Sequence, residues 1–163
     1  MNQYYWEIAV EFSFSDEQIA LFESAARRIA SLGLVRASSG NVSCRVDSSH
    51  FLISESRSWL ADLTSEQVAV CRLEDCECIN DKTPSIETAF HQGVLQQRGD
   101  INVVLHFQTV STTAAACHKN GEINFNLIPE IPFYIGQIAT VPFIVPGTPG
   151  LARAVVSAMK EHD

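Results

Sequence analysis

Residues 84–108 read PSIETAFHQGVLQQRGDINVVLHFQ, and this stretch decides the fold because it holds a helix, a turn and a strand in direct succession. We predict a helix that opens at Pro84 and runs to about Gln97. Its expected buried side carries apolar residues at helical spacing, namely Ile86, Phe90, Val94 and Leu95. Arg-Gly-Asp then turns the chain into the mostly β-branched run 101–105, which predicts a buried strand that ends at His106.

The rest of the chain alternates helix and strand patterns without a repeat or a linker. Ser15 is a typical N-cap, and apolar residues recur after it at helical spacing up to Gly33, which predicts a helix between them. The other segments follow in chain order: strand-like runs in 35–46, 51–54 and 68–73, a polar loop at 74–82, helical patterns at 109–117 and 151–163, and proline-punctuated strands or loops at 128–136 and 140–147. This mixture predicts one α/β domain over residues 1–163, with a largely antiparallel sheet.

Composition and charge exclude several classes of protein. With 163 residues, of which 46% are apolar, the chain is long enough for one sizeable core and is not of a disordered or collagen-like composition. Its net charge is −8 and its longest basic block is Arg27-Arg28, which argues against nucleic acid or an anionic membrane surface as a partner. No apolar run approaches the ~20 residues of a membrane span, and the N-terminus lacks a signal-peptide pattern.

The five cysteines indicate the compartment. Their number is odd and no CxxC pair exists, so free thiols in a reducing cytoplasm are expected. Cys76 and Cys78 form a CxC pair in the loop 74–82. This pair could bind a metal, but zinc sites of this kind use four ligands, so two ordinary loop thiols are the simpler interpretation.

Glu87 and two histidines are candidate metal-binding and acid/base residues. Glu87 lies near the start of the predicted helix, where the helix dipole alone favours a carboxylate, and His91 one turn further on could pair with it. His106 ends the predicted strand, where a single histidine is often only a core residue. Together, however, carboxylate and imidazole form a ligand set that suits a divalent ion such as Zn²⁺.

Gly40 and Asn41, in the sequence SSGNVS, allow two interpretations. Both residues tolerate positive φ and therefore suit a turn between strands. Glycine also lets a ligand approach the backbone closely, so the segment could be a pocket for an oxyanion. The role of Ser85 is also undecided, because a serine at the start of a helix is an ordinary N-cap.

Several ordered motifs together resemble the class II aldolase/adducin family. They are SGNVSCR at 39–45, LIS-x-S-x-S-W at 52–59, PSIE-x-x-x-H at 84–91, the strand that ends in His106, and PGTPGLA at 146–152. The resemblance covers nearly the whole chain from about Ser15. It implies a three-layer class II aldolase-like fold, with a central mainly antiparallel sheet flanked by helices, and a homotetramer with sites between subunits.

The resemblance also implies an activity. The members that the motifs match best cleave L-fuculose 1-phosphate, so the implied function is a zinc-dependent aldolase that splits a small phosphorylated sugar into dihydroxyacetone phosphate and an aldehyde. Zinc would act as a Lewis acid on the ketone, and a carboxylate would move a proton at carbon. The alternatives are a related sugar-phosphate epimerase or dehydratase, or an adducin-like assembly protein without catalysis.

Residue by residue, the resemblance assigns roles at nine positions. Glu87 matches the catalytic glutamate, and Tyr134 matches the tyrosine acid that a neighbouring subunit supplies. His106 matches the first histidine of a metal-binding His-x-His pair, whose second position is Gln108 in this chain. The positions that match phosphate-binding residues are Gly40, Asn41, Ser56, Arg57 and Ser85.

The chain departs from the family pattern in several places. Gln108 offers an amide oxygen, which is a poorer zinc ligand than imidazole. Arg57 replaces a glycine of the second phosphate loop, and it could supply charge to a phosphate or close the loop by its bulk. The last metal-binding histidine of the family lies in a strand after the helix that ends here at Asp163. We therefore expect either that the domain continues beyond this chain or that the protein is inactive.

Overall fold

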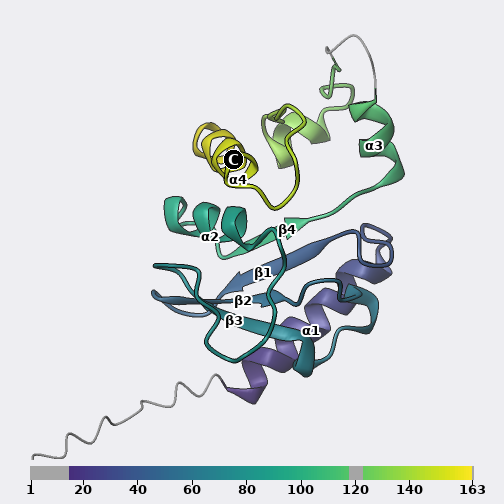
Figure 1. Cartoon of the computed structure of the whole chain (residues 1–163). Helices are drawn as coiled ribbons and strands as arrows, with labels where there is room; N and C mark the ends of the chain where they lie inside the picture. Colours follow the sequence, from purple (N-terminus) through teal and green to yellow (C-terminus); the bar gives the residue numbers. More distant parts are fainter. Residues whose placement is uncertain (1–14, 118–122, 163) are drawn as a thin grey trace, which may run out of the picture.

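A four-stranded antiparallel sheet forms the centre of the structure, a computed structural model that describes residues 15–117 and 123–162 (Figure 1). Its strands are β1 (Asn41–Arg45), β2 (His50–Ser54), β3 (Val68–Arg72) and β4 (Val103–His106). They lie in the order β3-β2-β1-β4, and each neighbouring pair is antiparallel. The last strand in the chain therefore pairs with the first.

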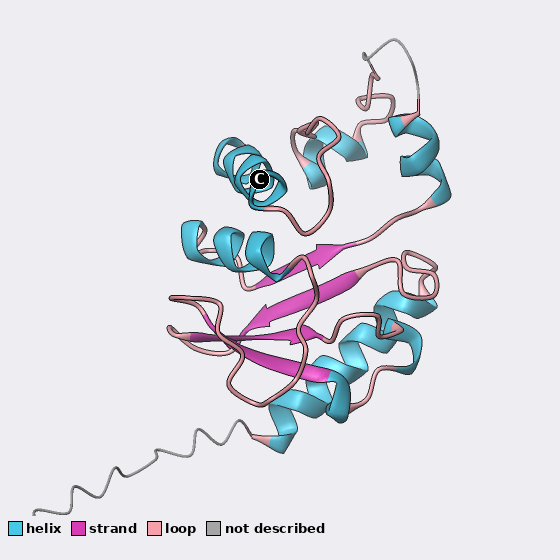
Figure 2. Ribbon diagram, in the orientation of Figure 1, coloured by secondary structure: helices cyan, strands magenta, loops and turns pink. Residues whose placement is uncertain are grey.

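Helices cover both faces of the sheet (Figure 2). The longer helices are α1 (Asp16–Ser31) on one face, α2 (Thr88–Gln97) on the other, and α4 (Pro149–Glu161), which packs on α2. The short helices are η1 (Leu60–Asp62), η2 (Ser65–Gln67), α3 (Val110–Ala116) and the π-helix η3 (Ile131–Ile135). This arrangement confirms the expected α/β class with an antiparallel sheet between helices. No helix in the described ranges is long and apolar enough to cross a membrane.

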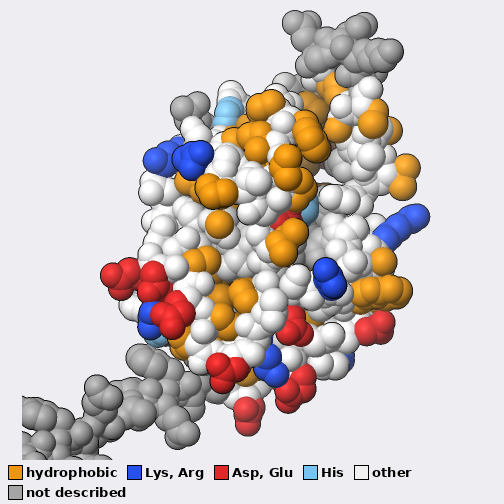
Figure 3. Space-filling view, viewed as in Figure 1, with side chains coloured by type: hydrophobic (Ala, Val, Ile, Leu, Met, Phe, Trp, Pro, Cys, Tyr) orange, Lys and Arg blue, Asp and Glu red, His pale blue; other side chains and the backbone are white. Residues whose placement is uncertain are grey.

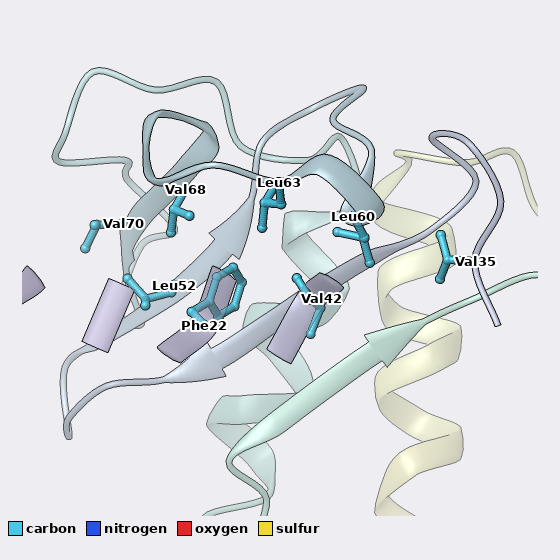
Figure 4. Packing of buried hydrophobic residues seen from close by; sticks show 9 residues of the cluster. Phe22, Val35, Val42, Leu52, Leu60, Leu63, Val68 and Val70 are labelled. Carbon is cyan, nitrogen blue, oxygen red and sulfur yellow. The ribbon is translucent and has the colours of Figure 1, made fainter. Parts of the chain in front are cut away.

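β2 and β3 bury both of their faces, because alternate residues point to opposite sides of the sheet and helices cover each side. The buried residues on the α1 side are Phe22, Ala26, Val35, Val42, Leu52, Leu60, Leu63, Val68 and Val70 (Figure 4). Those on the α2 side are Phe51, Ile53, Ala69, Cys71, Leu73 and Leu95. Continuous apolar runs such as 51–53 and 68–71 are therefore strands covered on both sides, as the sequence indicated.

The ends of α1 follow from two residues. Ser15 Oγ accepts a hydrogen bond from the Gln18 N–H (3.2 Å), and the Gln18 side chain accepts one from the Ser15 N–H (3.3 Å), which is a capping box. Gly33 follows the C-cap and has a φ of 75°, a conformation that glycine adopts without strain. Both predicted ends of this helix are confirmed.

The start of α2 differs from the prediction. The helix begins at Thr88 and Glu87 is its N-cap, because Pro84 lies in an isolated β-bridge that keeps the preceding residues extended. Ser85 lies before the helix, where its Oγ accepts a hydrogen bond from the Glu87 N–H (3.3 Å). Ile86 is 67% exposed, so its predicted place on the buried side is wrong.

The strand after α2 is less buried than predicted. It lies at the edge of the described sheet, and Val103 is 53% exposed. Its side chains line an apolar hollow that α4 closes on the other side with Leu151, Val155 and Met159. The β-branched run predicted a strand correctly, but the position of a strand within a sheet depends on pairing that the local sequence does not encode.

Two further segments differ from expectation, and one agrees. Residues 35–40, expected to include a strand, form a loop in which Ala37 has a φ of 51°. Part of 128–136, expected as strand or loop, is the π-helix η3. The predicted helix at 109–117 is confirmed as α3.

The packing of α4 on α2 depends on Gly93. A Cβ at this position would lie 2.5 Å from Cγ2 of Val156 in α4, well inside van der Waals contact. The far end of α4 is held by Arg98, whose Nη1 donates hydrogen bonds to the carbonyls of Met159 (3.1 Å) and His162 (2.9 Å). The two helices therefore approach closely because one of them lacks a side chain at the contact.

We predict that Gly93→Ala lowers the free energy of unfolding by about 1–3 kcal/mol, because the new methyl group overlaps the stiff, β-branched Val156. Gly99→Ala is the matched control, since nothing lies within 4 Å of a Cβ at that position. The double variant Gly93→Ala/Val156→Ala is expected to recover part of the loss. Denaturant unfolding measures all of these, and an unchanged midpoint for Gly93→Ala would contradict the described packing.

Candidate functional site

A cavity of about 320 Å³ opens beside the start of α2. Its walls come from the loop before β1, the loop after β2, the start of α2 and the chain at the end of β4. The lining residues are Ser38, Ser39, Gly40, Asn41, Glu55, Ser56, Arg57, Ser85, Ile86, Glu87, His106, Gln108 and Pro146. Eight of the nine residues to which the resemblance assigns roles are among them.

Tyr134 is the ninth, and it lies outside this cavity. It belongs to η3, is 76% exposed, and contacts Phe133 edge-on with ring centroids 4.9 Å apart. The resemblance places this tyrosine in the site of a neighbouring subunit. A side chain that is exposed on one subunit can enter the site of a neighbouring subunit. The catalytic role of Tyr134 stays a prediction.

Groups from two strands hold the carboxylate of Glu87. Asn41 Nδ2 donates a hydrogen bond to Oε2 (2.8 Å), and Nδ1 of His106 lies 2.6 Å from the same oxygen. Asn41 and His106 are directly opposed in the β1–β4 pair, so their side chains emerge together on one side of the sheet. The carboxylate near the start of the helix and the histidine at the end of the strand thus meet at one site.

Glu87 carries a negative charge at neutral pH although its side chain is only 10% exposed. The imidazole of His106 is the largest influence and lowers the pKa of Glu87, burial acts in the opposite direction, and the Asn41 amide lowers the pKa further. The net effect is a pKa below the ordinary value of a glutamate. Glu87 is therefore available as a proton acceptor across the neutral range.

A buried histidine lies behind Asn41. Nε2 of His91 is 2.5 Å from Asn41 Oδ1, and Nδ1 is 2.8 Å from Ser43 Oγ. The His91 ring is fully buried and stacks on Phe90 with centroids 4.5 Å apart. Burial above all lowers the pKa of His91 to about 3, so the ring is neutral. The expected pairing of His91 with Glu87 is therefore indirect, through Asn41.

The cavity also offers small and polar groups. A Cβ on Gly40 would lie 2.6 Å from the carbonyl oxygen of His106, so the approach of the two chain segments requires glycine. Ser56 and Ser85 bring hydroxyl groups and Arg57 brings a cationic side chain. Arg57 has a φ of 65°, in the left-handed region that favours glycine, which explains the glycine of the family pattern at this position.

The described residues form an incomplete metal site. The side chains of His106 and Gln108 line the same cavity, so these two residues are the candidate donors to a cation. Within residues 15–117 and 123–162, however, no three His, Cys, Asp or Glu side chains are grouped so that they could hold a metal ion. Catalytic zinc uses three protein ligands and an open position. The residues present thus do not hold a catalytic metal by themselves, and the Cys76–Cys78 pair consists of free thiols.

Comparison with known proteins identifies the family. The family model of the Class II Aldolase and Adducin N-terminal domain matches residues 21–163, which is most of the chain. The L-fuculose-1-phosphate aldolase of Thermus thermophilus has a TM-score of 0.72 and 26% identity, covering 88% of this chain and 71% of that one. YgbL from Escherichia coli has the same fold, with a TM-score of 0.78 and 21% identity, covering 90% of this chain and 72% of that one. The chain therefore belongs to the class II aldolase and adducin family.

Curated relatives have several different activities. The 3-oxo-tetronate 4-phosphate decarboxylase of Haemophilus influenzae is 28% identical over 139 residues, which are 83% of this chain and 66% of the relative. The 5-methylthioribulose-1-phosphate/5-deoxyribulose-1-phosphate aldolase of Rhodospirillum rubrum is 33% identical over 140 residues, 83% of this chain and 60% of the relative. The methylthioribulose-1-phosphate dehydratase of Yersinia enterocolitica is 30% identical over 96 residues, which are 59% of this chain and 46% of the relative. The chain thus spans less than about two thirds of these relatives.

Several residues of the site were given no role from the sequence, although they lie in or beside the motifs at 39–45 and 84–91. Ser38 and Ser39 line the cavity, and their place directly before Gly40 was a signal for them. Ser43 and His91 were not recognised as partners, because their contact forms only when α2 packs over β1. A tertiary contact of this kind leaves no trace in local spacing.

We predict that His91 makes the protein less stable in acid. An unfolded histidine titrates near pH 6.5, whereas folded His91, with a pKa of about 3, stays neutral well below that pH. Between these values the unfolded state binds more protons, so the free energy of unfolding falls as the pH falls, by at most about 1.4 kcal/mol per pH unit. Above about pH 6.5 both states are neutral and this effect disappears.

Denaturant unfolding at a series of pH values from about 7.5 to 4.5 measures this slope. His91→Gln is expected to remove the contribution of His91, because glutamine does not titrate. Thr88→Val, a buried and non-titrating position in the same helix, controls for general weakening of α2 and is expected to keep the slope. Equal slopes in the wild type and His91→Gln would contradict the prediction.

Proposed function

We propose that this protein is a lyase that breaks a bond to the carbon next to the ketone of a small phosphorylated sugar or sugar acid. The observation that carries the proposal is the ionised carboxylate of Glu87, held by Asn41 and His106 at the wall of a cavity that Arg57 also lines. The names of the relatives support it, because they include a decarboxylase, an aldolase and a dehydratase that act on phosphorylated 3-oxo or ketose compounds.

These reactions share one chemical requirement at the carbon next to the ketone. Aldol cleavage and decarboxylation both leave an electron pair on the carbon next to the ketone, and dehydration begins with removal of a proton from that carbon. An ionised carboxylate can take or return a proton there. A divalent metal such as zinc, if it were held beside His106 and Gln108, would supply Lewis-acid polarisation of the ketone oxygen. We assign the acid/base role to Glu87. The leading reaction of the proposal is cleavage of a carbon–carbon bond, as the family resemblance implies for L-fuculose 1-phosphate.

The phosphate is proposed to bind among four residues that line the cavity, namely Gly40, Ser56, Arg57 and Ser85. Serine hydroxyls donate hydrogen bonds, and a guanidinium adds charge and can contact two phosphate oxygens at once. The side chain of Asn41 is engaged by Glu87 and His91. A contact of Asn41 with phosphate would therefore come from its backbone.

Assembly into a homotetramer is part of the proposal. Exposed apolar residues follow one another in the chain before α4: Leu127, Ile128, Phe133, Tyr134, Ile135, Ile138, Phe143 and Val145. Apolar side chains gather over the part of the molecule that holds α2, α4 and this segment (Figure 3). Such patches mark interfaces, and a neighbouring subunit at this face would bring Tyr134 near another copy.

An adducin-like assembly protein without catalysis is the second candidate. Gln108 favours it, because an amide stands where the family pattern has a ligand histidine. The deciding experiment is turnover by the purified protein, with and without added zinc, of L-fuculose 1-phosphate, 5-deoxyribulose 1-phosphate and 3-oxo-tetronate 4-phosphate. Metal-dependent cleavage of one of them supports the enzyme. Absence of turnover together with absence of zinc binding supports the assembly protein.

We predict that Glu87→Gln lowers kcat on the accepted substrate by roughly 10²–10⁴-fold, the usual effect of losing a general base. Glutamine keeps the shape of the side chain and can still accept a hydrogen bond from Asn41, but it cannot take a proton. Glu66→Gln, with a side chain that is 84% exposed, is the charge-matched control. A wild-type rate for Glu87→Gln would reject the assigned role.

We predict that Gln108→His raises the affinity of the protein for zinc by about tenfold or more, because imidazole is a better zinc ligand than an amide. Gln108 and His106 line the same cavity, so the change restores a pair of ligands. Calorimetric titration with zinc at constant pH measures the affinity, and His106→Ala is expected to weaken it in either background. Unchanged affinity in Gln108→His would show that residue 108 does not face the metal.

A further inference from the structure

We propose that Ser43 and His91 are positioning residues, which fix the side-chain amide of Asn41 and thereby the direction of the Glu87 carboxylate. The inference rests on the function proposed above, because it concerns the same carboxylate. Its basis is a continuous chain of side-chain contacts that runs from Ser43 to His91, from His91 to Asn41 and from Asn41 to Glu87.

The direction of each hydrogen bond follows from the contact with the carboxylate. An ionised carboxylate only accepts, so the Asn41 group 2.8 Å from Glu87 Oε2 is the NH₂. Asn41 Oδ1 therefore faces Nε2 of His91 at 2.5 Å, and because this oxygen only accepts, Nε2 carries the proton. Nδ1 of the neutral ring then has no proton and accepts from the Ser43 hydroxyl at 2.8 Å.

The reverse orientation of the Asn41 amide is disfavoured at Glu87 and requires a rearrangement at His91. A flipped amide would turn its oxygen towards the carboxylate, which places two acceptors together. It would also turn its NH₂ towards Nε2 of His91, so the ring would have to carry its proton on Nδ1 and Ser43 would have to accept instead of donate. In the observed orientation the Nε2–H of His91 donates to the Asn41 oxygen, so His91 and Glu87 favour the same orientation of the amide.

The burial of these residues separates two roles. Ser43 and His91 are fully buried, and neither lines the cavity. Asn41 and Glu87 do line it. A substrate in the cavity would therefore meet the carboxylate and the amide but not the hydroxyl or the imidazole. Ser43 and His91 can influence the reaction only through Asn41.

A purely structural role for His91 is the alternative, and it makes a different prediction. A satisfied buried imidazole stabilises the core, so its replacement would lower activity only by reducing the amount of folded protein. A positioning residue changes kcat in the folded protein. It leaves KM nearly unchanged, because the proposed phosphate site around Arg57 is not altered.

Two substitutions of His91 distinguish these roles. His91→Phe keeps a ring of similar size but removes the N–H group, whereas His91→Gln restores an N–H donor near the position of Nε2. In folded His91→Phe we expect kcat to fall about 10- to 100-fold with KM within about twofold of wild type, and in His91→Gln we expect most of kcat to return. His50→Phe, at a buried histidine of β2 outside this chain of contacts, is the control and should keep kcat. Wild-type kcat in folded His91→Phe would overturn the proposal.

Nitrogen NMR of ¹⁵N-labelled protein tests the geometry without turnover. We expect His91 as the neutral Nε2–H tautomer, and a slowly exchanging Asn41 NH₂ in the wild type and in His91→Gln but not in His91→Phe. An Nδ1–H tautomer in the wild type would overturn the proposal. If His91→Phe does not fold, Ser43→Ala tests the same chain, because loss of the donor to Nδ1 should weaken the Nε2–H signal. If the wild type shows these signals but turns over no substrate, the hydrogen-bond chain is supported and the proposed enzyme activity is refuted.

Discussion

The pairing register of β1 against β4 is the constraint on which the site depends. It sets Asn41 opposite His106 and Ser43 opposite Val104. Since side chains alternate between the two faces of a strand, Asn41, Ser43 and His106 share the face on which α2 packs. Because β1 is also paired with β2, a slip of β4 by one residue along β1 would turn His106 towards α1 and remove the imidazole from the carboxylate of Glu87. The fold and the chemistry therefore rely on the same ladder of hydrogen bonds.

The charge of Glu87 is tolerated because its donors are fixed. A carboxylate that is 10% exposed has lost most of its water, and burial alone would raise its pKa. The amide of Asn41 and the imidazole of His106 reverse this effect, so that the pKa of Glu87 lies below its ordinary value. The overall charge of −8 says little about this site, because the nearby groups decide its electrostatics.

Local features of the sequence predicted the elements whose cause is local. The capping box at Ser15, the glycine after α1 and the apolar runs of β2 and β3 are determined by residues within a few positions of one another. The start of α2 and the exposure of β4 were mispredicted because a β-bridge and the strand order decide them. The family resemblance identified eight residues of the cavity, but the contact of His91 with Ser43 became evident only from the packing of α2 on the sheet.

Two of the positions at which this chain departs from its family line the cavity of the group to which we assign the chemistry. Arg57 and Gln108 line the same cavity as Glu87. The backbone at Arg57 keeps the left-handed conformation suited to glycine, so the substitution adds a charged side chain without removing the turn. A group that moves a proton next to a ketone serves decarboxylation, aldol cleavage and dehydration alike. We infer that residues such as Arg57 and Gln108, which can contact the rest of the substrate or a metal, decide which of these reactions follows.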